Sequence, residues 1–213
     1  MMRPLLSGPQ HDRAVVWKPL MSKRPKSGLD PVKIYKHASA FHKSYDLLTK
    51  AVIPANGALS EEQLVGTIAH PAMVLSIFAS ELYLKCLLCV ESGSVPEGHN
   101  LKKLFSGLQL ATRRELDDLW DADIRHPDKQ DAIERLRSMP LGQEIRLDLR
   151  YALDVGANSF TELRYFYETE RAYVLISHFP FLLRNVILKR SPSWGAIVPD
   201  PSKGLIRSNK RTR

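Results

Sequence analysis

The chain has 213 residues, of which 44% are hydrophobic and 25% charged, and its formal net charge is +8. These values are typical of a globular protein, and they exclude a collagen-like, disordered or low-complexity interpretation of the whole chain. Two cysteines are too few for a disulfide scaffold and favour a reducing, cytoplasmic location. The first residues contain no apolar stretch long enough for a signal peptide, so none is predicted.

The charge is distributed unevenly. Residues 1–33 contain seven Lys/Arg and two Asp (+5), residues 184–213 contain eight Lys/Arg and one Asp (+7), and residues 34–183 contain 16 basic and 20 acidic residues (−4). Basic termini attract phosphate backbones by Coulomb steering and counterion release. Solvated tails that keep a protein soluble have the same composition, so both interpretations stay open.

The first predicted elements are an arm and a helix. Residues 1–29 are rich in Pro, Ser, Lys and Arg and predict an irregular basic arm. Asp30 followed by Pro31 predicts a helix start, since Asp caps helices and Pro suits the first helical position. This helix runs to about Lys50, and its apolar face contains Ile34, Ala38, Phe41, Tyr45 and Leu48.

A long second helix follows. Ser60 to Gln63 has the pattern of a capping box and predicts a helix that runs to Ser92, is interrupted at Pro71 and ends at Gly93. Between Ala72 and Val90 this helix is apolar almost all round, which predicts a place in the middle of a bundle or in a dimer interface. The 17 uncharged residues from Leu64 to Ser80 fall short of the roughly 20 that a membrane span needs, so no membrane association is predicted.

Further helices are predicted in the second half. A short helix begins at His99–Leu101, and a capping box at Thr112–Glu115 opens a helix to about His126. Residues 127–143 are polar and suit a variable side of the domain with a short helix, while residues 144–156 fit helix or loop equally well.

The last predicted helix covers about 171–190 and bends at Pro180, and residues 191–213 form a second irregular basic tail. No strand alternation or internal repeat is present. The sequence therefore predicts an all-α fold, with an antiparallel helical bundle over 30–190 between the arm 1–29 and the tail 191–213.

Common catalytic and metal motifs are absent from the sequence. Cys86 and Cys89 have redox-pair spacing, but they fall in the middle of an apolar helix and predict core packing. A zinc site would need two further ligands, and no second pair exists. No Walker loop, dinucleotide loop, HExxH or GxSxG pattern occurs, so we expect neither a metal nor a cofactor.

Five polar residues occur in apolar surroundings: Glu81, Lys85, His99, Arg164 and Glu168. A charge inside a bundle must be paired, because an unpaired one costs several kcal/mol. One interpretation is a structural network in which Glu81 pairs with Arg164, Lys85 pairs with Glu168 and His99 caps a helix. The other is a polar pocket whose cations bind a phosphate.

Arg171 and His178 form a second candidate pair. They are seven residues apart, or two helical turns, so both project from one face of the predicted last helix. A chance combination of an arginine at a helix start and a histidine on an apolar face gives the same spacing.

Three short blocks in this order resemble the HEPN superfamily: Phe78 to Leu88, Gly98 to Leu104, and Leu163 to Glu168. The resemblance covers about residues 70–190. It implies a helical bundle, usually dimeric, often prokaryotic, and associated with toxin–antitoxin or phage-defence systems. Several members are metal-independent ribonucleases with an Arg-x(4–6)-His motif that meets its copy across a dimer interface, and Arg171 and His178 fit this motif.

Two functions follow from these observations. The first is a HEPN-like homodimeric module that binds RNA or a nucleotide and interacts with a partner protein such as an antitoxin. The second is a metal-independent endoribonuclease in which His178 is the general acid and base and Arg171 stabilises charge on the phosphorane. Exposure of His178 in a groove favours the enzyme, and burial among apolar side chains favours the binding module.

Overall fold

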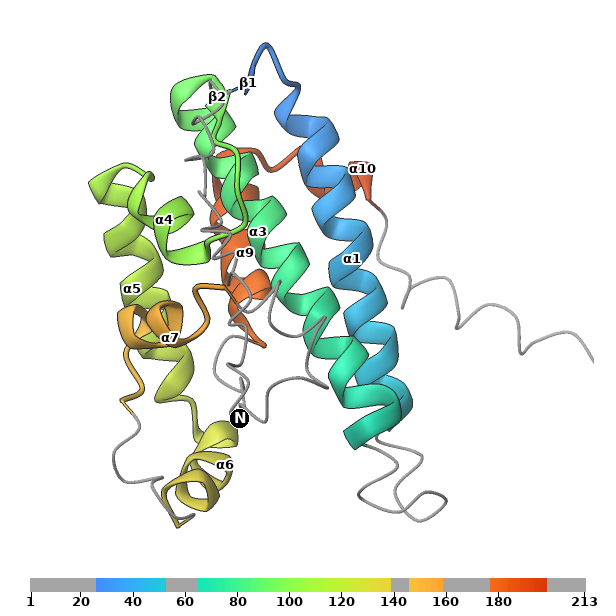
Figure 1. Ribbon diagram of the computed structural model, residues 1–213, viewed down its shortest axis with the longest axis vertical. Helices are drawn as coiled ribbons and strands as arrows, with labels where there is room; N and C mark the ends of the chain where they lie inside the picture. Colours follow the sequence, from blue (N-terminus) through green and yellow to red (C-terminus); the bar gives the residue numbers. More distant parts are fainter. Residues whose placement is uncertain (1–25, 53–64, 139–145, 159–176, 199–213) are drawn as a thin grey trace, which may run out of the picture.

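The computed structural model describes residues 26–52, 65–138, 146–158 and 177–198. Within these ranges the protein is helical apart from one pair of two-residue strands, so the predicted all-α class is confirmed (Figure 1). In chain order the elements are β1 (Lys26–Ser27), α1 (Pro31–Val52), η1 (Val65–Ala69), α3 (His70–Ser92), β2 (Ser94–Val95), α4 (Leu101–Ser106), α5 (Leu110–Ile124), α6 (Pro127–Ser138), α7 (Leu149–Val155), α9 (Phe179–Arg190) and α10 (Trp194–Ile197).

Helix α1 begins where the sequence predicts. The Asp30 carboxylate accepts a hydrogen bond from the Val32 N–H at 2.9 Å, and Pro31 is the first helical residue. The buried face is rotated slightly from the predicted one, because polar side chains share it with apolar ones. Its fully buried members are Tyr35, Ala38, Ser39 and His42.

Helix α3 is the centre of the bundle. It returns antiparallel to α1, and α9 and α4 pack on its other sides (Figure 1). A π-helical turn, η1, leads into it, and Pro71 lies in its first turn, which accounts for the interruption predicted there. Gly93 ends it with φ 68° and donates to the Cys89 carbonyl, as predicted. The capping box at Ser60–Gln63 lies outside the described residues.

The segment Thr67–Ser92 is long and apolar enough to cross a membrane by length and composition, with a mean hydropathy of 1.8. Inside this bundle 61% of that stretch is buried by protein, which is what the core helix of a globular domain shows. Polar side chains of this helix are covered as well, since Ser76 and Ser80 are completely buried. The Ser76 hydroxyl donates to the Ser177 carbonyl at 2.8 Å and so joins α3 to the segment before α9.

The start of α5 corrects the prediction of a capping box at Thr112–Glu115. The helix begins at Leu110, two residues earlier, and Gln109 makes no side-chain cap. Instead Glu91, at the end of α3, accepts hydrogen bonds from the Gln109 N–H at 2.8 Å and from the Thr112 hydroxyl. A tertiary carboxylate therefore replaces the local cap, because it offers two acceptor oxygens where the helix N-terminus is positive.

The last helix is shorter in the described region than predicted. Helix α9 starts at Phe179, His178 precedes it in a turn, and Pro180 lies in the first turn, where proline does not bend a helix. Residues 171–176 of the predicted helix lie outside the described residues. Phe181 of α9 is exposed, while six other residues of this helix are buried in the bundle: Phe179, Pro180, Leu182, Leu183, Val186 and Ile187.

Secondary structure also occurs inside the segments predicted to be an irregular arm and an irregular tail. Strand β1 falls in the arm and pairs antiparallel with β2, while α10 falls in the tail. Trp194 of α10 packs on the buried Tyr35 with ring centroids 5.4 Å apart. The compact part of the chain therefore extends beyond 30–190 at both ends.

The two cysteines are buried in the core, as predicted. The Cys86 thiol lies 3.4 Å from the Pro31 carbonyl oxygen, and the Cys89 thiol lies 3.3 Å from that of Leu29. Burial raises the pKa of Cys86 to about 12, which keeps it a neutral thiol. Among the described residues no group of three His, Cys, Asp or Glu side chains is arranged to hold a metal ion.

Candidate functional site

The first polar cluster is built around the carboxylate of Glu81 in the middle of α3. Its side chain is 1% exposed and binds two partners. The Lys85 ammonium lies 2.7 Å from its Oε1 atom, one helical turn away, and His99 Nδ1 lies 3.0 Å from both of its oxygens. The buried negative charge is therefore fully engaged, as a charge at this depth requires.

The loop between β2 and α4 places His99 over Glu81. Gly98 adopts φ 108°, a conformation that side-chain-bearing residues rarely take, and so turns the chain back toward α3. Asn100 caps α4 by accepting from the Lys103 N–H at 2.9 Å, and the Leu101 N–H donates to the Ala157 carbonyl at 3.0 Å. This local structure fixes where the imidazole lies.

A cavity of about 420 Å³ opens beside the cluster. One of its ends presents Lys85 and His99, and its walls are mainly apolar. The His99 side chain is 54% exposed, so it meets both the buried carboxylate and the solvent. The remaining lining residues are Leu29, Ile34, Leu82, Val95, Pro96, Glu97 and Gly98.

Of the five polar residues singled out in the sequence, the structure brings Glu81, Lys85 and His99 together. The predicted role of His99 as a helix cap is wrong, because Asn100 caps α4 and His99 binds Glu81 instead. Arg164 and Glu168 lie outside the described residues, so their predicted pairings stay predictions. Lys85 binds Glu81 on its own helix, in the favourable order of acid before base.

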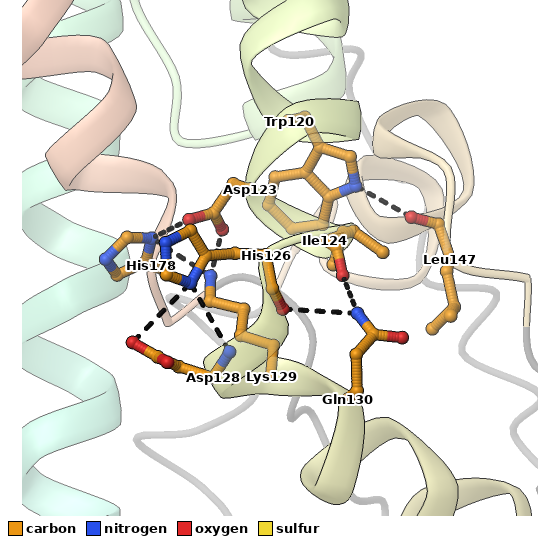
Figure 2. A network of polar contacts seen from close by, with 9 residues as sticks. All are labelled: Trp120, Asp123, Ile124, His126, Asp128, Lys129, Gln130, Leu147 and His178. Carbon is orange, nitrogen blue, oxygen red and sulfur yellow. Dashed lines mark hydrogen bonds and ion pairs between the residues drawn. The ribbon is translucent and has the colours of Figure 1, made fainter.

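A second polar cluster surrounds His178. Its Nδ1 atom lies 3.0 Å from Asp123 Oδ1 and 3.3 Å from the Lys129 ammonium, and Lys129 also pairs with Asp123 (Figure 2). With the ring proton on Nδ1, His178 donates to Asp123 and the lone pair of the neutral ring lies on Nε2; with that proton on Nε2, Nδ1 accepts from Lys129 instead. Among the residues that the structure describes, Nε2 has no hydrogen-bond partner, and the side chain is 42% exposed.

Three elements meet in this cluster, at the end of α5, on α6 and just before α9. The Trp120 indole N–H donates to the Leu147 carbonyl at 2.7 Å, which anchors the end of α5. Gln130 donates to the Ile124 carbonyl at 2.9 Å and holds α6 against α5 (Figure 2). His178 also stacks on Phe181, with ring centroids 4.9 Å apart. Arg171, its predicted companion, lies outside the described residues.

Asp123 and Lys129 were not identified in the sequence. They lie in a stretch rich in Asp, Lys and Arg, where a single carboxylate or ammonium carries no signal. Asp123 is also 55 residues from His178, and no local periodicity links the two. One sequence feature could have pointed to them. Residues 121–131 are mostly polar, and the segment has few apolar positions for a buried helix face.

A buried histidine lies close to this second cluster. His42 on α1 is 6% exposed, and its Nδ1 lies 3.4 Å from the Tyr83 hydroxyl, which in turn bonds to Ser39 at 3.0 Å. Burial is the main reason that the pKa of His42 is lowered to about 4, and the positive charges of Arg184 and His178 contribute in the same direction. His42 is therefore neutral at physiological pH and acts as a hydrogen-bonded core residue.

Comparisons of the chain with protein-family models, with curated proteins and with solved structures find no match.

Proposed function

We propose that this protein is a HEPN-like helical module that binds RNA or a nucleotide in the cavity beside Glu81, Lys85 and His99. One observation carries the proposal: a carboxylate that is 1% exposed holds a lysine and a histidine at the end of a 420 Å³ cavity. The first two blocks of the HEPN resemblance supply all three of these residues. A helical bundle is also the architecture that the resemblance implies.

The cavity combines surfaces that a nucleotide needs. Its apolar walls, which include Leu82 and Ile34, suit the face of a base, while the Lys85 ammonium provides donors for a phosphate. The Nε2 atom of His99, whose Nδ1 binds Glu81, provides a further polar contact. Because Glu81 holds both side chains in place, less side-chain entropy is lost when a ligand binds. The volume of the cavity lies within the roughly 300–1,000 Å³ typical of small-ligand pockets.

The test compares two cavity variants with a control variant outside the cavity. Leu82→Trp narrows the cavity and His99→Ala removes one polar contact, and each should weaken binding about tenfold or more. Binding of a labelled single-stranded RNA is measured by fluorescence anisotropy, and binding of adenosine 5′-monophosphate by calorimetry. Lys103→Met removes a positive charge from an exposed position of α4 and should change the affinity by about twofold at most. A loss in Lys103→Met as large as the losses in the two cavity variants, or no loss in the cavity variants, would contradict binding in the cavity.

The basic tail contributes a second, less specific part of the proposal. Residues 199–213 contain five Lys/Arg and one Asp, a composition that neutralises backbone phosphates. A chain that ends at Val198 keeps Trp194 on Tyr35 and should bind RNA more weakly, with a flatter dependence on salt. An unchanged salt dependence would remove the tail from the binding surface.

A second candidate, a metal-independent endoribonuclease, is favoured by the exposure of His178. A half-exposed imidazole whose Nδ1–H is oriented by Asp123 has the arrangement of a general base. In this reaction Nε2 takes the proton of the RNA 2′-hydroxyl, the 2′-oxygen attacks the phosphorus, the bond to the 5′-oxygen breaks, and the His178 imidazolium returns its proton to that oxygen. The products are a 2′,3′-cyclic phosphate and a 5′-hydroxyl, and the HEPN resemblance implies that Arg171 and the second copy of a homodimer complete the site.

RNA incubated with the protein in EDTA tests this candidate. Cleavage that leaves cyclic phosphate ends and is lost in His178→Ala supports it. His126→Ala is the control, since His126 is an exposed histidine at the same end of the bundle and binds Asp128 rather than Asp123. Absence of cleavage by the wild-type protein, or equal loss in both variants, contradicts the enzyme and leaves the binding module.

A further inference from the structure

A second cavity lies between α4, α5 and α7. Its volume is about 280 Å³, and three cationic side chains line it: Lys102, Arg113 and Arg150. The Ser106 hydroxyl and the Asp154 carboxylate also reach its wall, and Phe105 and Leu153 close the apolar side. Both of these apolar residues are buried, which gives the cavity a rigid base.

Positive charge exceeds negative charge around this cavity. Lys102 forms an ion pair with Asp154, and both side chains are about half exposed. A guanidinium nitrogen of Arg150 lies 3.8 Å from Asp117 Oδ2. Burial raises the pKa of Asp117, against the opposing effect of Arg150 and Arg113. Arg113 has no ion pair among the described residues, and the charged residues that line the cavity are three cations and one carboxylate, that of Asp154.

Arg113 also contains an unsatisfied donor. Its Nε atom is shut off from solvent and has no hydrogen-bond partner within the described part of the chain. A buried donor without an acceptor is costly, and more so on a charged group, which indicates that an acceptor is missing. A bound oxyanion that draws the flexible side chain toward the cavity gives this donor its acceptor.

We propose that this cavity binds a phosphate group, with Lys102, Arg113 and Arg150 as its ligands. Two guanidinium groups and an ammonium around one small space match the charge and the several acceptor oxygens of a phosphate. The volume suits a phosphate with a sugar-sized attachment and excludes a helix or a folded partner. The phosphate belongs to a phosphorylated small molecule or to the backbone of a single-stranded nucleic acid.

This proposal goes beyond the ligand cavity at His99. The two cavities share no lining residue, so the phosphate site can be present or absent whether or not RNA or a nucleotide binds beside Glu81. His99→Ala, which disrupts the first cavity, should leave the phosphate site unchanged. Failure of one proposal is therefore distinguishable from failure of the other.

The test uses the full chain and a pair of neighbouring arginines. Calorimetry measures the binding of ribose 5-phosphate, with ribose as the uncharged counterpart, to the wild type and to Arg113→Met, Arg150→Gln and Arg114→Met. Arg114 is exposed on the same helix and does not line the cavity, so its variant makes the same change in net charge. Each variant is checked for native helix content by circular dichroism, and Arg150→Gln provides the answer if Arg113→Met does not fold.

We expect ribose 5-phosphate to bind at millimolar concentration or below, ribose not to bind, and both cavity variants to lose about tenfold or more. Arg114→Met should keep the wild-type affinity. If only a labelled single-stranded RNA binds, and the cavity variants weaken it more than Arg114→Met does, the phosphate is that of a nucleic-acid backbone. Equal affinity in all variants for both probes, or no binding of either probe, overturns the site.

Discussion

The two polar clusters have the same chemical composition but lie at different depths. Each contains one carboxylate, one lysine and one histidine, with the carboxylate between the two bases. The Glu81 side chain is 1% exposed, whereas that of Asp123 is 14% exposed, and Lys85 is better covered than Lys129. Because the cost of an unpaired charge rises with burial, breaking the pairs of the first cluster should cost more free energy than breaking those of the second.

The clusters also differ in what surrounds them. Glu81 belongs to the central helix α3, and buried residues of that helix both precede and follow it. Asp123 is at the end of α5 and faces α6, a helix without buried residues. A rigid cluster beside a cavity suits binding, while a half-exposed histidine at a lightly packed corner suits a group that must exchange protons.

Replacing the lysine of the deeper cluster should have the largest effect on stability. Lys85→Met leaves Glu81 with His99 as its remaining described partner, and we expect a loss of about 3 kcal/mol in the free energy of unfolding. Adding Glu81→Leu should recover much of this loss, because the buried charge is then gone. Urea denaturation of both variants checks the prediction, and a double variant no more stable than Lys85→Met would show that Glu81 is not the stranded charge.

The second-largest effect on stability should come from acid, which lowers the free energy of unfolding through His42. The native pKa of His42 is about 4, below its ordinary value of 6.5, so between these pH values the unfolded chain binds a proton that the native protein does not. The free energy of unfolding therefore falls as the pH drops from about 6.5 to about 4, by up to about 3 kcal/mol from this residue.

The measurement is urea denaturation at pH 7 and pH 5 of the wild type and of His42→Gln. Carboxylates titrate in both proteins, so the contribution of His42 is the difference between the two pH dependences. Identical pH dependences would mean that the native protein can protonate His42 beside Tyr83, Asp46, Arg184 and His178 without cost.

Replacing the lysine of the shallower cluster should cost less. Lys129→Met leaves Asp123 partly exposed and still bound to His178, so we expect a loss of about 1 kcal/mol or less. Since α6 buries no residue, its amide hydrogens should exchange faster while those of α3 stay protected. A loss as large as that of Lys85→Met would remove the contrast between the clusters.

The histidines themselves should contribute least to stability. His99 and His178 are both about half exposed, so His99→Gln and His178→Gln should each change the free energy of unfolding by about 0.5–1 kcal/mol. Thermal denaturation at neutral pH checks this, and a change above about 2 kcal/mol in either variant would show a structural role that its exposure does not indicate.

Local signals in the sequence predicted much of the fold. Asp30 with Pro31 marks the start of α1, and Gly93 marks the end of α3, because caps and breaks depend on the backbone of neighbouring residues. The i, i+4 spacing of Glu81 and Lys85 allows the pair that the structure contains, but the sequence interpretation assigns them Arg164 and Glu168 as partners. The prediction was wrong at Thr112, where a carboxylate 21 residues away replaced the local cap.

The amino-acid sequence by itself therefore determined the all-α class, the start of α1, the end of α3 and the apolar character of the central helix, since these depend on interactions within a few residues. Tertiary structure alone decided that His99 binds Glu81 from 18 residues away, that Asp123 and Lys129 surround His178, and that α4, α5 and α7 enclose three cations. These contacts join segments that are far apart in the sequence and meet only because the helices pack together. The periodicity of a single helix cannot predict such contacts. Burial, which separates the two chemically identical clusters, is likewise a property of the packed bundle and not of any one residue.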